Sequence, residues 1–147
     1  MSDNASTVNP LAVAEARVKQ LTAEVERWKA RASRRPGLRR VIVESPFGAD
    51  SPAEVERNRA YARAAMLDCL LRGEAPMASH LLYTQVLDDG VPAEREQGLE
   101  AGLAWGPVAD ATVAYLDRGI SNGMRVGIAR ATREGRPVEY RCLEVDQ

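Results

Sequence analysis

The sequence has few of the residues that build metal centres and disulfide frameworks. Its 147 residues include one histidine and two cysteines. One histidine is too few for a histidine-based zinc site, and the cysteines lack the CxxC spacing of a metal or redox motif. No apolar run approaches the ~20 residues that a membrane-spanning helix needs, and no signal peptide is evident. The sequence therefore predicts a cytoplasmic protein without a metal, a cofactor or a membrane contact.

An excess of charge of one sign is also missing. Lys and Arg number 20 and Asp and Glu 21, so the net charge is −1, and the composition gives no general attraction for a nucleic acid polymer. Residues 29–40 are locally basic, which fits either a solvated helix end with its linker or an anion-binding patch. Cys69 and Cys142 lie in apolar surroundings and are expected to be reduced, buried thiols.

The first 36 residues have the pattern of a disordered start followed by one helix. Residues 1–8 are small and polar, and we expect them to be disordered. Asn9 and Pro10 are typical of a helix start, and Arg35-Pro36-Gly37 is typical of a helix end followed by a linker. These signals predict a helix over residues 10–34, separate from a domain over residues 37–147.

Apolar residues recur along this helix in steps of three and four, which is a heptad stripe. A coiled coil that joins copies of the chain into a homo-oligomer would use such a stripe, with Glu24 and Lys29 placed to pair between chains. An amphipathic helix packed on its own domain would use it equally well. The stripe consists of Leu11, Ala14, Val18, Leu21, Val25, Trp28 and Ala32.

After the linker, short apolar runs alternate with helix-like segments. Strands that alternate with helices of about ten residues or more predict a parallel sheet covered on both faces. We therefore expect an α/β fold with a small doubly wound sheet of about four to five strands, Rossmann-like or flavodoxin-like. The expected strands cover residues 41–43, 76–78, 111–116 and 137–142, and the helices residues 52–72, 92–105 and 121–135. The first of these helices is expected to bury Val55, Ala62, Ala65, Met66, Cys69 and Leu70.

Polar turns follow three of the predicted strands, at residues 45–48, 79–83 and 117–125. Ligands of doubly wound sheets bind beyond the carboxyl ends of the strands, where the strand order reverses. These turns are therefore expected to converge on one ligand-binding edge. Asp110 precedes its strand, so we expect it at the opposite edge in a structural role.

The first two turns carry aromatic and polar candidates for ligand binding. Ser45 and Pro46 open the first turn, and Phe47 is the only phenylalanine of the chain. Its ring either stacks on a nucleobase or plugs the end of the sheet. His80 either binds a ribose hydroxyl or phosphate, moves a proton, or is a structural hydrogen-bonding residue. Tyr83 adds a stacking face or a hydroxyl, or else packs in the core.

The third turn leads into a helix at Ser121, and such a start leaves backbone N–H groups free for a phosphate, a carboxylate or a sugar hydroxyl. Asp117 is placed to hold a ribose hydroxyl, and Arg118 and Arg125 are placed to hold phosphate. Arg125 also fits a solvated helix position. The ligand-binding residues expected here are Asp117, Arg118, Ser121, Gly123, Met124 and Arg125.

Four stretches, taken in order, resemble one known family. They are Glu44–Phe47 with Asn58 and Ala62, Ala78–Tyr83, Asp88-Asp89 with Glu94-Arg95, and Ser121–Met124. By themselves, Asp88 and Asp89 before Gly90 favour a turn over a paired-carboxylate site. From residue 41 to about 141 the chain resembles the nucleoside 2-deoxyribosyltransferase-like superfamily, in its small phage and bacterial branch. The resemblance implies a doubly wound fold and a pocket for a nucleoside or nucleotide.

The chain departs from that family at one position. The family signature Ser-x-Gly-Met-x-x-Glu ends in the acidic residue that attacks the sugar while the base leaves. Here Ser121, Gly123 and Met124 match the signature, but Gly127 stands at the acidic position. Glu44, His80 and Asp117 remain as weak candidates for a catalytic role.

Three hypotheses follow from this departure. The first is non-catalytic binding of a nucleoside or nucleotide; in one version a phage protein, acting in the host cytoplasm, sequesters a nucleotide signal of host defence. The alternative is a nucleoside deoxyribosyltransferase or N-glycosidase that acts on a nucleotide with a relocated carboxylate. The third is a structural assembly protein that works through its N-terminal helix.

Overall fold

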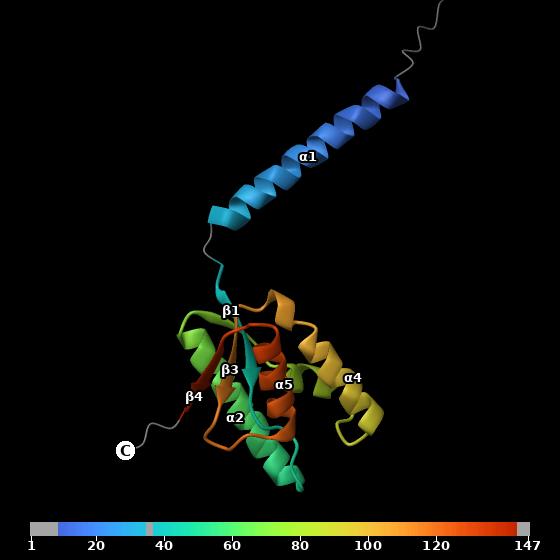
Figure 1. Ribbon diagram of the computed structural model, residues 1–147. Helices are drawn as coiled ribbons and strands as arrows, with labels where there is room; N and C mark the ends of the chain where they lie inside the picture. Colours follow the sequence, from blue (N-terminus) through green and yellow to red (C-terminus); the bar gives the residue numbers. More distant parts are fainter. Residues whose placement is uncertain (1–8, 35–36, 144–147) are drawn as a thin grey trace, which may run out of the picture. The chain divides into compact units, whose positions relative to one another are not determined.

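The computed structural model describes residues 9–34 and 37–143, without the side chains of residues 28–34 (Figure 1). The chain divides into two compact units, Met1–Gly37 and Leu38–Gln147. The predicted disorder of residues 1–8, the predicted helix end at 35–36 and the stripe residues Trp28 and Ala32 lie outside what is described. Within the described part, no helix is both long and apolar enough to cross a membrane.

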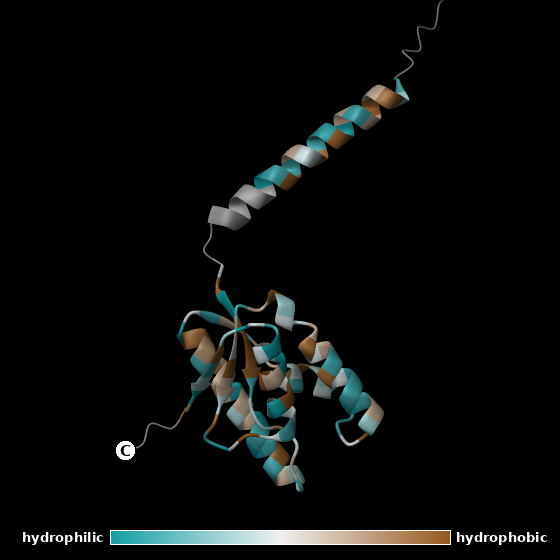
Figure 2. Ribbon diagram, in the orientation of Figure 1, coloured by the Kyte–Doolittle hydropathy of each residue, from teal (hydrophilic) through white to brown (hydrophobic). Residues whose placement is uncertain are grey.

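The first unit contains one helix, α1, over Pro10–Arg34. The Asn9 side chain accepts a hydrogen bond from the Leu11 backbone N–H at 3.0 Å, which caps the helix as expected. The apolar stripe recurs along the helix in Figure 2, and Leu11 and Val18 are about two-thirds exposed. The pairing of this stripe with another copy stays a prediction, and the side chain of Lys29 lies outside the described residues.

The second unit is built on a four-stranded parallel sheet in the order β2-β1-β3-β4, which confirms the predicted α/β fold. In the centre of the sheet, Val41 pairs with both Pro76 of β2 and Ala111 of β3. The strand order therefore reverses between β1 and β3. The strands are β1 (Arg39–Glu44), β2 (Glu74–Met77), β3 (Ala111–Tyr115) and β4 (Val138–Arg141).

Helices cover both faces of this sheet (Figure 1). The connection from β1 to β2 runs one way along the sheet and the later connections run back, so right-handed crossovers place α2 on one face and α4 and α5 on the other. These elements are α2 (Pro52–Leu71), the short α3 (Ser79–Leu82) with a 3-10 turn (Tyr83–Gln85), α4 (Pro92–Leu103) with a second 3-10 turn (Gly106–Val108), and α5 (Asn122–Arg133).

The main core lies between the sheet and α2. Val41 and Val43 of β1 and Tyr115 of β3 pack there against Cys69, and all four are buried. The expectation for Leu70 is wrong: its side chain is 55% exposed, because it lies about 100° around the helix from buried Cys69. Met66 is partly buried and packs against this core, as expected. Two further corrections concern the ends of the helix and chain. Val55 is only partly buried, and Cys142 is exposed, because it follows the last residue of β4.

Every second residue of β1 faces the side of the sheet opposite α2. In a strand, successive side chains point to opposite faces. Because Val41 and Val43 face α2, Ile42 and Glu44 face α4 and α5. Asp110 lies at the opposite end of the sheet, as expected, where its carboxylate accepts a 2.7 Å hydrogen bond from the Arg40 backbone N–H.

Candidate functional site

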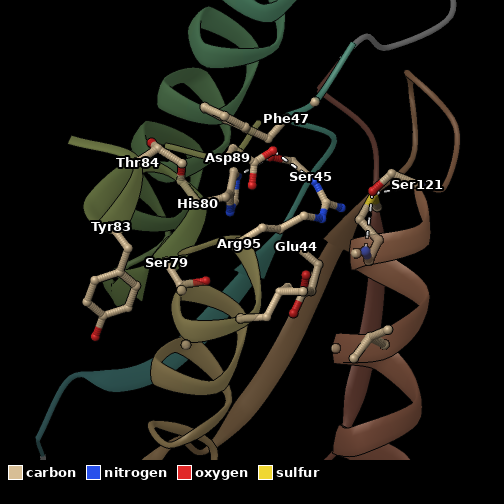
Figure 3. Close-up of a pocket in the computed structure, with 18 of the residues that line it drawn as sticks. Glu44, Ser45, Phe47, Ser79, His80, Tyr83, Thr84, Asp89, Arg95 and Ser121 are labelled. Atoms are coloured by element: carbon tan, nitrogen blue, oxygen red, sulfur yellow. Dashed lines mark hydrogen bonds and ion pairs between the residues drawn. The ribbon is translucent and has the colours of Figure 1, made fainter. Parts of the chain in front are cut away.

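A pocket of about 840 Å³ lies beside the carboxyl end of β1, at the reversal of the strand order (Figure 3). Its walls come from the turn after β1, from α3, from residues 87–106 and from the start of α5. The topology of the sheet explains the location of the pocket, because the loops after β1 and β3 run to opposite faces and leave a crevice between them. Within the described part of the chain, no group of three or more His, Cys, Asp or Glu side chains is placed to hold a metal ion.

One wall holds Phe47, His80 and Ser45. The Ser45 hydroxyl and His80 Nε2 are 2.8 Å apart, and the ring of His80 meets the ring of Phe47 edge-on, with centroids 6.2 Å apart. Burial lowers the pKa of His80 to about 4, so at neutral pH the imidazole is uncharged and offers one donor and one acceptor. Arg59 of α2 lies over the Phe47 ring, with its guanidinium carbon 5.4 Å from the centroid.

The loop before α4 forms a second, charged wall. Asp89 and Arg95 pair at 2.8 Å and both line the pocket. Asp88 closes the turn instead: its carboxylate accepts from the Gly90 N–H at 2.8 Å, and its own N–H donates to Glu94 at 2.6 Å. The turn predicted at Asp88 is therefore confirmed.

Glu44 reaches the pocket from the end of β1, and its side chain is directed toward α5 (Figure 3). Among the described residues, no hydrogen bond or salt bridge joins its carboxyl group to another side chain or backbone, and the residue is partly exposed. Burial raises the pKa of Glu44 to about 8, with the charge of Arg136 partly opposing the shift. At neutral pH this carboxyl group is therefore mostly protonated, and it can donate a hydrogen bond as well as accept one.

Gly127 gives the Glu44 carboxyl its space. A Cβ atom built on Gly127 would lie 1.9 Å from Oε1 of Glu44, far inside van der Waals contact. Gly127 is buried within α5. The carboxyl of Glu44 thus fills the space that any side chain at position 127 would need. The structure therefore places Glu44 beside Gly127, the position at which the sequence departs from the resembled signature.

Alanine at position 127 is expected to change stability in opposite directions in two backgrounds. In the wild type, the Glu44 carboxyl must swing away from the new Cβ, and we expect a destabilisation of about 1–2 kcal/mol. In the Glu44→Ala background the space is free, and alanine should stabilise α5 by up to about 1 kcal/mol. Urea unfolding of the wild type, both single variants and the double variant measures this coupling. Equal effects in both backgrounds would show that the two residues do not compete for this space.

Arg136 closes the inner end of the pocket. Its side chain is 6% exposed, Nε donates to the Thr112 hydroxyl at 3.0 Å, and the guanidinium pairs with Glu134. A Cβ on Gly106 would lie 2.7 Å from the Arg136 guanidinium, so glycine leaves room for this side chain. Arg136 is a fixed, charge-compensated group and not a free anion-binding residue.

The start of α5 uses its own polar groups. The Ser121 hydroxyl accepts from the Met124 N–H at 3.3 Å, and Met124 Sδ accepts from the Ser121 N–H at 3.4 Å. Met124 is buried, and Ser121, Gly123 and Met124 all line the pocket. Tyr83 also lines it, and its hydroxyl accepts a 2.9 Å hydrogen bond from Trp105.

Four of the predicted site residues do not line the pocket. Asp117 belongs to a cluster on the α2 face, where its carboxylate accepts from the Tyr61 hydroxyl and, at 2.9 Å, from the Leu143 N–H. Arg118 lies over the Tyr61 ring, 5.7 Å from its centroid. Pro46 and Arg125 are also absent from the lining.

The lining residues that the sequence did not indicate include two arginines, Arg59 and Arg136. Arg59 is one of several arginines along α2, and only the fold shows which of them meets Phe47. Arg136 precedes its strand, so it would be expected at the opposite edge of the sheet. Its length and the missing side chain at Gly106 bring it back along the sheet face.

Comparisons with known proteins gave matches of two kinds. Residues 39–141 match a family described as a domain of unknown function, DUF7768. The fold is similar to that of a 2-deoxyribosyltransferase from Bacillus psychrosaccharolyticus, described as a biocatalyst for the synthesis of antiviral and antitumoral nucleosides. The identity is 17%, the TM-score 0.51, and the match covers 74% of this chain and 77% of the enzyme. A search of curated proteins gave no match.

Proposed function

The chain belongs to the DUF7768 family, and we propose that this protein binds a nucleoside or nucleotide in the pocket beside Glu44. The observation that carries the proposal is the pocket itself, because about 840 Å³ at the reversal of a parallel sheet is the size and place of a small-molecule site. The fold it shares with a 2-deoxyribosyltransferase supports a nucleoside-shaped ligand. Gly127, where the related signature has an acidic residue, favours binding without turnover.

The lining offers the mixed contacts that such a ligand needs. The Phe47 ring and the apolar lining residues Leu87 and Leu99 give surfaces for a base, and aromatic stacking contributes about 1–3 kcal/mol per base. His80 and the Asp89–Arg95 pair supply hydrogen-bonding groups for sugar hydroxyls. A protein that only binds would hold its ligand out of solution, which is the chemistry of sequestration.

Recovery of bound ligand tests this proposal. The full chain is incubated with the common nucleosides, their 5′-monophosphates and cyclic nucleotides, washed, and heated, and the released compounds are identified by mass spectrometry. We expect one class to return intact, and its retention to fall about tenfold or more in Phe47→Ala. Arg125→Ala, outside the pocket, serves as the matched control. If nothing is retained, or if Phe47→Ala and Arg125→Ala retain as much as the wild type, binding in this pocket is wrong.

The position of Glu44 favours a second candidate function, cleavage or transfer at an N-glycosidic bond. Its carboxyl group lies in the pocket in the space beside Gly127, where the related signature has its acidic side chain. In this case the recovered fraction would contain free base or a sugar fragment. Glu44→Gln would then abolish the release of base, whereas a binding protein has no release to lose.

A further inference from the structure

We propose that the Glu44 carboxyl group selects the ligand by donating a hydrogen bond to an acceptor atom of the bound nucleobase, a ring nitrogen or a carbonyl oxygen. This inference rests on the proposed binding function and adds the chemistry of one contact. It makes Glu44 a specificity-determining residue of the pocket. A ligand without an acceptor at this point would lose this hydrogen bond and bind more weakly.

The pocket carboxylates differ in how they are engaged. Asp89 is paired with Arg95, both Asp88 and Glu94 accept backbone N–H groups, and Asp50 is exposed to solvent. The Glu44 carboxyl is the one that lies beside Gly127 on the pocket wall, is partly exposed there, and has no hydrogen bond or ion pair to another described residue. A polar group without a protein partner gains a hydrogen bond when a ligand atom of the right kind meets it. Glu44 is therefore the group with most to gain from a ligand atom.

The groups around Glu44 determine whether its carboxyl is protonated when a ligand binds. The cation whose charge acts on Glu44 is Arg136, which already pairs with Glu134, and Arg95 of α4 already pairs with Asp89. From the other sides the pocket presents uncharged His80 and the guanidinium of Arg59, which lies over Phe47. Burial therefore dominates and raises the pKa of Glu44 to about 8. The protonated carboxyl has one O–H donor, which calls for an acceptor on the ligand.

Gly127 fixes the place of this donor. Because Gly127 has no side chain, the Glu44 carboxyl can rest against the backbone of α5. The helix backbone at Gly127 forms one wall against the carboxyl, and buried Met124 of the same helix also lines the pocket. The O–H group is thereby confined to one part of the pocket, as a group that discriminates between ligands must be.

Binding measured against pH tests the inference. Isothermal titration uses adenosine, cytidine, their 2′-deoxy counterparts and the 5′-monophosphates of all four. If ionised Glu44 does not bind, wild-type affinity for the nucleobase that it selects should fall about tenfold between about pH 6 and 9. Glu44→Gln keeps an N–H donor, so its affinity should remain without this fall. Glu44→Ala should bind about tenfold more weakly at about pH 6. Any titration of the ligand itself cancels in the ratio of wild type to Glu44→Gln, and Glu96→Gln on exposed α4 surface is the matched control.

The outcomes separate the inference from the proposed function. A fall in affinity in the wild type alone, with weak binding in Glu44→Ala, supports the hydrogen bond. Binding that follows the same pH profile in the wild type and Glu44→Gln overturns the inference but leaves the binding function standing. Absence of binding by the wild type and Glu44→Gln at every pH overturns the proposed function, and the inference falls with it. Circular dichroism of each variant shows whether it is folded.

Discussion

Glutamine in place of Glu44 should make the protein more stable than the wild type at alkaline pH, by up to about 5 kcal/mol. The pKa of Glu44 is about 8 in the folded chain and 4.5 in its ordinary state. Between these values the folded state binds more protons than the unfolded state, so wild-type stability falls as pH rises through this window. Glutamine does not titrate and escapes the loss. The two stability curves should therefore separate above about pH 4.5 and run parallel above about pH 8.

Urea unfolding at a series of pH values measures this difference. The other carboxylates of the chain are present in both proteins, so their contributions cancel between the two curves. Glu96→Gln, which removes an exposed carboxylate from α4, should instead follow the wild type. Parallel curves for Glu44→Gln and the wild type across the whole range would mean that the Glu44 carboxyl is not dehydrated in the folded protein.

Removal of the Glu74 carboxylate should cost about 3 kcal/mol of the free energy of unfolding. Glu74 opens β2 with its side chain only 7% exposed, and it binds Arg141 of β4 through two contacts of 2.7 and 2.9 Å and Arg39 of β1 at 2.8 Å. Glu74→Ala leaves the buried Arg141 guanidinium with Glu139 as its remaining carboxylate. The cost of keeping the Arg141 guanidinium buried with one carboxylate fewer causes more of the destabilisation than the lost attraction does.

Arg40, which follows Arg39 on β1, provides the matched control for Glu74→Ala. Arg40 pairs with Asp110 at 3.0 Å, but both side chains are largely exposed. Arg40→Ala should therefore change stability much less than Glu74→Ala, because solvent screens the exposed pair. Thermal or urea unfolding at neutral pH compares the two variants. Similar losses for both would show that burial does not set the strength of the ion pairs along this part of the sheet.

The fold could be predicted because its signals are local and periodic. The alternation of apolar runs, such as 41–43 and 111–116, with helix-like segments predicted a parallel sheet of about four to five strands, whereas the order β2-β1-β3-β4 came only from the structure. The predicted range 52–72 agrees closely with α2, whose ends carry two local signals: the Ser51 hydroxyl accepts from the Glu54 N–H at 3.3 Å, and Gly73 takes φ 77° directly after the helix. A short helix at α3 in place of a simple turn was missed, because four residues carry too little periodicity.

The candidate site was harder to predict, because it depends on which way each side chain turns. The turns after β1 and β2 supplied Phe47 and His80, and both line the pocket. Asp117 follows β3 by two residues and shares the parity of Tyr115, so its carboxylate turns to the α2 face and meets Tyr61. The contact between Glu44 and Gly127 spans β1 and α5, and no spacing in the sequence reveals it.

The parallel sheet also has a consequence for the order in which the chain can assemble. Arg40 and Asp110, which meet at one end of the β1–β3 pair, are 70 residues apart in sequence. Parallel strands are joined by long connections, which must close before the strands can form their hydrogen bonds. Folds dominated by such distant contacts therefore assemble slowly. During synthesis, the apolar segment Val41–Val43 leaves the ribosome long before β3 exists to cover its second edge. That interval is when the nascent chain is most exposed to aggregation, and a strand-masking chaperone would matter most then.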